Sequence, residues 1–221
     1  GGIASHRRLA GSIGAAAHAH VLAVEYRKMP EHPPSVSVQD CLDGYRWLLD
    51  RGFAPGQIAI AGDSAGGFLT AMTAIALRDA GMELPAALIL ENPLIDPTPS
   101  RRREGAYRTA DPLFPHLAFT QFDRMIRESE PAGDAVAPLD VELTGLPPTL
   151  IQVGSHEMLR VDAEDFAAKL MAHHGRPTIK ELRVAGVLKP AHIYVTDHDK
   201  AVALTLPEGL RLGAVHLTVT D

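Results

Sequence analysis

A glycine-flanked serine at the junction of two hydrophobic patterns constrains this sequence more than any other feature. The pentapeptide at 62–66 reads GDSAG, a G-x-S-x-G pattern. The segment Gln57–Ala61 before it is typical of a buried β-strand, and Phe68–Leu77 after it is typical of a buried helix. A serine on a tight strand-to-helix turn is held away from the sheet, where its hydroxyl can act as a nucleophile.

The same turn predicts the surroundings of Ser64. Glycine is expected at Gly62 and Gly66, because a Cβ at either position would crowd the neighbouring strand and helix. The backbone N–H of Ala65 is expected to point into the space beside the hydroxyl and to donate to an oxyanion. The sequence therefore predicts that Ser64 is a catalytic nucleophile; a glycine-rich turn with an exposed serine is the alternative.

Strand and helix patterns alternate along the rest of the chain. Strands that alternate with helices at this spacing form parallel sheets, so we expect an α/β fold whose mostly parallel sheet has helices on both faces. Ser37 and Asp40 resemble a capping box at the start of one helix. The other predicted elements are helices at Ser5–Ala17, Val38–Leu49 and Ala163–His173, and strands at His20–Tyr26, Ala86–Leu90, Thr149–Val153 and Ile179–Val184.

Composition sets the class of protein. With 221 residues, 46% of them hydrophobic, the chain fits a single domain over residues 1–221. A formal net charge of −6 gives no reason to expect a nucleic-acid partner. Cys41 is the only cysteine, which predicts a reducing, cytoplasmic location. No apolar run is long enough for a transmembrane segment.

Two stretches depart from the alternating pattern. The segment 97–138 contains three consecutive arginines, scattered prolines and a weak helix signal over Leu117–Ile126. We interpret this segment as an inserted lid or cap. The segment 195–221 is interpreted as an atypical tail, because it ends in a β-like run.

Two motifs stand a few tens of residues apart. Residues 26–33 read YRKMPEHP, and residues 62–67 read GDSAGG. Together they resemble the hormone-sensitive-lipase family of α/β-hydrolases, in its bacterial carboxylesterase branch, which pairs YR-x-x-PEHP with GDSAGG. The resemblance covers residues 1–186. It implies an α/β-hydrolase fold and hydrolysis of carboxylic esters with short or medium acyl chains, without a cofactor.

A serine nucleophile needs a base, a carboxylate that orients the base, and donors for the oxyanion. In α/β-hydrolases the acid follows the serine in the chain, so we expect it after the strand Thr149–Val153. Many members of the family have an aspartate where this chain has His156, which cannot stabilise an imidazolium as a carboxylate does. Glu157 is therefore the candidate acid and Asp162 the alternative. Asp162 with Asp165 also resembles a helix N-cap.

The base should follow the strand Ile179–Val184. The segment His192–Tyr194 resembles the family's H-x-aromatic signature, which makes His192 the candidate base. It comes a few residues later than in the family, and an insertion at 188–190 would explain the delay. His198 and His216 are the alternatives.

The resemblance also implies an HGG loop that supplies most of the oxyanion donors. In the family this loop precedes the histidine of an S-H-R segment, which here is Ser5–Arg7. We therefore expect the loop and the N-terminal strands of the fold to be missing from this chain. Ala65 would then supply the one oxyanion donor within it.

Three functions remain open at this point. The leading hypothesis is a serine carboxylesterase acting on a small-molecule ester, with Ser64, His192 and Glu157 as the triad. The second is a truncated or inactive homologue that only binds a ligand or partner. The third keeps the triad but hydrolyses amides or lactones. No histidine or cysteine spacing suits zinc, so no metal site is expected, and a homodimer is considered for the chain.

Overall fold

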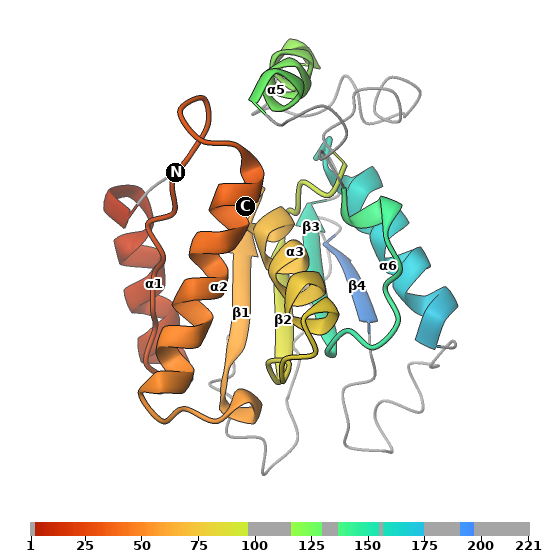
Figure 1. Cartoon of the computed structure of the whole chain (residues 1–221). Coiled ribbons are helices and arrows are strands. Elements are labelled where there is room, and N and C mark those ends of the chain that lie inside the picture. Colours follow the sequence, from red (N-terminus) through yellow and green to blue (C-terminus); the bar gives the residue numbers. More distant parts are fainter. Residues whose placement is uncertain (1–2, 97–115, 130–136, 155–156, 175–190, 197–221) are drawn as a thin grey trace.

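The described part of the chain is built around a parallel sheet of four strands (Figure 1). The structure is a computed structural model that describes residues 3–96, 116–129, 137–154, 157–174 and 191–196. The strands, in their order across the sheet, are β1 (Ala59–Asp63), β2 (Ala87–Glu91), β3 (Thr149–Gly154) and β4 (Ala191–Thr196). Each neighbouring pair is parallel, which confirms the α/β fold predicted from the alternating patterns.

The helices agree with the sequence predictions to within a few residues. They are α1 (Ile3–Ala17), α2 (Pro34–Asp50), α3 (Ala65–Asp79), α5 (His116–Ser129) and α6 (Arg160–His174), with short 3₁₀ turns η1 (Pro55–Gln57) and η3 (Pro138–Asp140). Helix α5 falls inside the segment 97–138, and most of the remainder of that segment lies outside the described residues. Figure 1 shows α5 beyond the end of the sheet toward which β1 and β3 point.

One face of the sheet is covered by α3 and α6. Burial alternates along β2 and β3, so every second side chain faces these helices. The core side chains from the strands are Leu88, Leu90, Ile151 and Val153, and those from the helices are Ala71, Ala74, Ile75, Ala163, Phe166, Ala167 and Leu170. The other face carries Ala61, Ile89 and Leu150, which are exposed or half-buried. The described contacts therefore place both helices on the same face.

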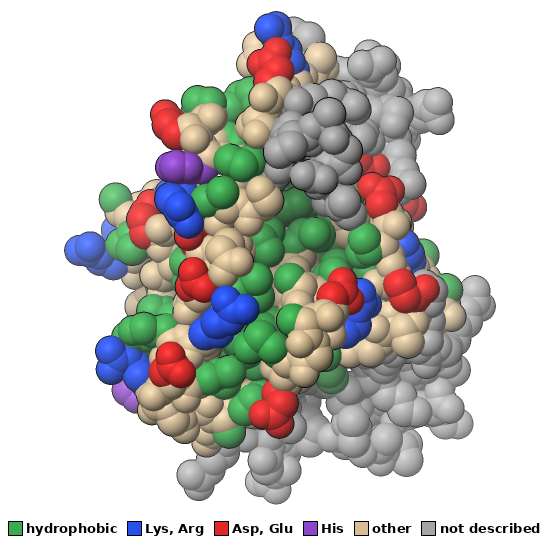
Figure 2. All heavy atoms as spheres, in the orientation of Figure 1, with side chains coloured by type: hydrophobic (Ala, Val, Ile, Leu, Met, Phe, Trp, Pro, Cys, Tyr) green, Lys and Arg blue, Asp and Glu red, His purple; other side chains and the backbone are tan. Residues whose placement is uncertain are grey.

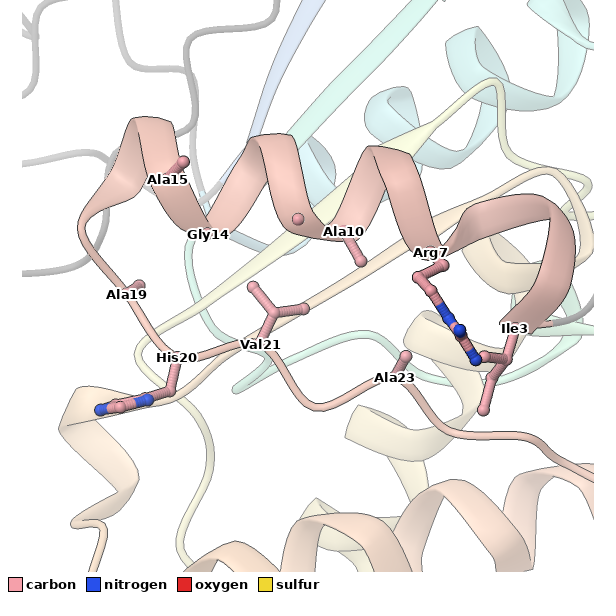
Figure 3. Close-up of a pocket in the computed structure, with 10 residues that line it drawn as sticks. Ile3, Arg7, Ala10, Gly14, Ala15, Ala19, His20, Val21 and Ala23 are labelled. Atoms are coloured by element: carbon pink, nitrogen blue, oxygen red, sulfur yellow. The ribbon is translucent and has the colours of Figure 1, made fainter.

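The predicted strand His20–Tyr26 does not form. Its backbone is assigned to no strand in the described part of the chain, although Val21 and Val24 face different helices. Val24 packs toward α2, with its Cγ2 2.9 Å from where a Cβ on Gly44 would lie. Val21 faces α1 across Gly14, beside a groove of about 510 Å³ (Figure 3). Val21 and Leu22 stay 46% and 40% exposed.

The fourth strand is also in an unexpected place. The predicted strand Ile179–Val184 lies outside the described residues. The structure instead pairs Ala191–Thr196 with β3, and this strand includes His192, which we expected to follow a strand. A run of six residues is too short for its pattern alone to identify it as a strand, which is why this element was missed.

The predicted capping box at Ser37 and Asp40 is wrong. Helix α2 begins earlier, at Pro34. Ser37 instead donates its hydroxyl to the Arg27 carbonyl at 2.6 Å, and Asp40 accepts hydrogen bonds from the Arg27 side chain at 2.6 and 3.1 Å. These hydrogen bonds hold the segment that begins at Tyr26 against α2. They form because a polar side chain near the start of a helix can reach a neighbouring segment.

On the face drawn in Figure 2, positive and negative side chains of the described residues are interspersed. No helix within the described ranges is both long and apolar enough to cross a bilayer.

The Arg27–Asp40 ion pair gives a prediction for stability. Hydrogen bonds from Arg27 hold the pKa of the Asp40 carboxyl below its ordinary value. The pair therefore stabilises the fold at pH values above the unfolded pKa of about 4. This stabilisation is lost as the pH falls through the lower folded pKa. We expect Asp40→Asn to unfold at lower urea concentration than the wild type at pH 7, by the small amount typical of exposed ion pairs. The difference should be smaller at about pH 2 than at pH 7, because the carboxyl becomes protonated as the pH falls. An equal difference at both pH values would contradict this account.

Candidate active site

Ser64 occupies a strained turn between β1 and α3. Its backbone has φ +57° and ψ −115°. A positive φ is rare for a residue with a Cβ and costs about 1–3 kcal/mol, so it persists only where the surroundings impose it. The strand–serine–helix arrangement predicted from the GDSAG motif is confirmed.

The backbone of Ser64 is fixed by the last residue of β2 and the segment that follows it. The Ser64 N–H donates to the Glu91 carbonyl at 2.9 Å, and the Ser64 carbonyl accepts from the Leu94 N–H at 3.0 Å. The Gly67 N–H also donates to the Ser64 carbonyl, at 2.9 Å. Hydrogen bonds thus restrain both the N–H and the carbonyl of the strained residue. We call residues 91–96, which are the last residue of β2 and the segment after it, the β2 loop; they supply two of these three bonds.

The glycines around Ser64 have different roles. A Cβ on Gly62 would collide with the Gly66 carbonyl, as predicted. A Cβ on Gly66 would meet no described atom within 4 Å, so the predicted crowding at that position is wrong. The crowded position is Gly67, where a Cβ would lie 2.6 Å from the Cβ of Pro93 and 2.8 Å from its Cα. The third glycine of GDSAGG, Gly67, was the sequence signal for this contact with the β2 loop.

Ala65 opens helix α3 directly after the nucleophile. Its N–H is one of the donors that the first turn of a helix leaves without an intrahelical acceptor. The positive end of the helix dipole lies at the same position and favours negative charge there. This part of the site can therefore stabilise an anion.

Glu157 lies in the turn between β3 and α6. With its amide nitrogen facing this carboxylate, Asn92 donates to Oε1 at 3.0 Å and to Oε2 at 3.1 Å. The Gly154 N–H donates to Oε1 at 3.3 Å. Because Asn92 belongs to the β2 loop, the loop that fixes Ser64 also contacts Glu157.

Asp162 is occupied elsewhere. It is 2% exposed, and its Oδ2 accepts hydrogen bonds from the backbone N–H groups of Ile95 at 2.7 Å and Asp96 at 2.8 Å. Helix α6 begins at Arg160, so Asp162 lies in its first turn and not at its N-cap. The carboxylate caps the end of the β2 loop, so the predicted N-cap role is wrong.

His192 is not brought to the same end of the sheet. It is the second residue of β4 and pairs with Leu150, whereas Thr196 pairs with Gly154 at the carboxyl end of β3. At about 3.3 Å per residue, its backbone lies about 13 Å before that end. Ser64 and Glu157 follow the carboxyl ends of their strands. His156, His198 and His216 lie outside the described residues.

Burial raises the pKa of two other described side chains, Cys41 and Glu91. Burial raises the pKa of the Cys41 thiol to about 11, which keeps it a poor nucleophile at neutral pH. Burial, followed by the charge of Asp63, raises the pKa of Glu91. Among the residues that the structure describes, no three histidine, cysteine, aspartate or glutamate side chains converge to hold a metal ion.

The packing of Gly67 on Pro93 can be tested with a neighbouring control. Gly67→Ala should lower the free energy of unfolding by about 1–3 kcal/mol, because the new methyl group must displace Pro93. Gly66→Ala is the matched control: it lies in the same helix, gains the same helix propensity, and has open space for its methyl group. Urea unfolding of both variants measures the difference. Equal stabilities would contradict the proposed contact.

Comparisons with known proteins agree with this fold. The family model for the alpha/beta hydrolase fold matches residues 1–186. An acetyl-hydrolase of Streptomyces hygroscopicus is 42% identical over 166 residues, which cover 72% of this chain and 54% of that protein. The esterase LipU of Mycobacterium tuberculosis is 37% identical over 222 residues, which cover 95% of this chain and 69% of that protein. The chain thus spans between about half and two thirds of these curated relatives.

Solved structures show the same fold. A crystal structure of an esterase from the bacterial hormone-sensitive lipase family is 34% identical, with a TM-score of 0.73, and the match covers 88% of this chain and 61% of that one. The esterase EstE5, in a crystal soaked with ethyl alcohol, is 32% identical with a TM-score of 0.77, and the match covers 88% of this chain and 62% of that one.

Proposed function

This chain belongs to the α/β-hydrolase family, in its bacterial hormone-sensitive-lipase branch, and from that premise we propose that it is a serine hydrolase of carboxylic esters. The observation that carries the proposal is the backbone of Ser64, held at φ +57° between β1 and α3. Strain of this kind is expected where a side chain must be presented for chemistry.

The roles of the first groups follow from their positions. The Ser64 hydroxyl attacks the ester carbonyl and forms an acyl-enzyme, which water then hydrolyses. The Ala65 N–H donates to the oxyanion that develops during both steps. Glu157 orients the base and stabilises its imidazolium form. Burial favours Glu157 over Asp162: Asp162 is 2% exposed and its Oδ2 already serves two backbone N–H groups, whereas Glu157 is half-buried.

The base is proposed from chain order. His192 carries the H-x-aromatic signature and is the first candidate. Its place near the amino end of β4 argues for testing His198 beside it, since His198 stands two residues after the last residue of that strand in the chain. His216 is the remaining alternative.

The substrate proposed is a small ester with a short or medium acyl chain. The Streptomyces relative is named an acetyl-hydrolase, and the mycobacterial relative an esterase, which supports a small acyl group. The segment 97–138, which contains α5, is proposed as the lid that would shape the acyl site. A cytoplasmic location is also proposed, because Cys41 is the single cysteine of the sequence. Three alternatives remain predictions from the sequence: a homodimer, hydrolysis of amides or lactones, and a homologue that only binds a ligand or partner.

Ester turnover tests the assignment. We expect the protein to hydrolyse p-nitrophenyl acetate or butyrate and Ser64→Ala to lose about 10³-fold or more of kcat, because the nucleophile is removed. A p-nitroanilide of the same acyl group, assayed in parallel, separates esterase from amidase activity. Unchanged ester turnover in Ser64→Ala would overturn the proposal.

The base and the acid are assigned with the same assay. His192→Ala and His198→Ala are compared with each other, and Glu157→Gln with Asp162→Asn. We expect one histidine variant, and Glu157→Gln, to lose most of kcat while KM changes little. A loss on Asp162→Asn with wild-type turnover in Glu157→Gln would move the acid to Asp162.

A further inference from the structure

We propose that Asn92 is a positioning residue whose side-chain amide holds the Glu157 carboxylate in the orientation that the base requires. This inference rests on the proposed function, because it takes Glu157 as the triad acid. It concerns a residue that lies far from Glu157 in the sequence, in the loop that leaves the neighbouring strand.

The contact fixes the carboxylate in two directions. An ionised carboxylate only accepts hydrogen bonds, so the Asn92 amide is assigned with its nitrogen toward Glu157, 3.0 Å from Oε1 and 3.1 Å from Oε2. One donor group then spans both oxygens. A donor shared in this way restricts rotation of the carboxylate about its last bond. The bond from the Gly154 N–H to Oε1, at 3.3 Å, is longer and restrains one oxygen only. Hydrogen bonds to an ionised carboxylate are stronger than those between neutral groups.

The backbone of Asn92 is itself held in place. Its N–H donates to the Gln152 carbonyl of β3 at 2.7 Å, and its φ is +43°. Asparagine tolerates this left-handed region better than most residues. The residue before it, Glu91, accepts the Ser64 N–H. The amide is therefore anchored to the strand that precedes Glu157 and lies one residue from the bond that fixes the nucleophile.

The chemistry of an amide suits this task. An amide offers N–H donors and carries no charge, so it can hold a carboxylate without neutralising it. An aspartate at this position would have nearly the same shape but would place a second carboxylate against the first. The chain contains no other asparagine.

The positive φ of Asn92 dictates the choice of variants. Asn92→Ala would add backbone strain to the loss of the amide, so it cannot separate the two effects. Asn92→Gly removes the amide and keeps the backbone conformation accessible. Asn92→Asp keeps the shape but replaces the donor with a charge of the same sign as Glu157. We expect both variants to lower kcat for p-nitrophenyl butyrate by about 10-fold or more with little change in KM, because misplacement of a catalytic group slows the chemical step.

A double-mutant cycle distinguishes a positioning role from a structural one. If Asn92 acts through Glu157, Asn92→Gly should change kcat by less than about 2-fold in a Glu157→Gln background. Urea unfolding of each variant checks that the fold is retained. Equal losses from Asn92→Gly in the wild-type and Glu157→Gln backgrounds would overturn the proposal, as would wild-type kcat in both Asn92 variants. Wild-type turnover in Glu157→Gln itself would instead show that the acid was assigned wrongly.

Discussion

The site depends on the hydrogen bonds between the backbone of Ser64 and the β2 loop. One bond joins the Ser64 N–H to Glu91 and another joins its carbonyl to the Leu94 N–H. The strained conformation costs about 1–3 kcal/mol. Each buried hydrogen bond contributes about 0.5–1.5 kcal/mol, so these bonds, with the contact between Gly67 and Pro93, are of the size needed to offset the strain. Without them, the turn would relax and the serine would lose its presented position.

The β2 loop also joins the nucleophile to the acid side of the site. Glu91 and Leu94 of this loop bind Ser64, and its Asn92 binds Glu157. Its last two residues donate to Asp162. Parallel strands make this possible, because the carboxyl ends of β1, β2 and β3 meet at one edge of the sheet. A buried carboxylate with two backbone donors, as at Asp162, holds such a loop firmly. Residues outside the triad thus determine whether the proposed triad is aligned.

Sequence patterns predicted the parallel sheet, the helices and the turn at Ser64, because each depends on local periodicity and on a few turn residues. They could not show whether His20–Tyr26 would find a partner strand, since alternation reports only which side chains share a face. They assigned Ser37 and Asp40 to a cap because spacing alone does not show that Arg27 lies within reach. The contact between Asn92 and Glu157 joins distant segments of the chain and has no local signature.

The most direct test of the account is whether Ser64 is activated in the folded protein. Intact-mass measurement after reaction with a fluorophosphonate counts covalent adducts, and peptide mapping locates them. The account predicts one adduct per chain, on Ser64, and none in Ser64→Ala. A protein that is shown to be folded but gains no adduct, or gains one elsewhere, would contradict the claim that this turn presents a working nucleophile.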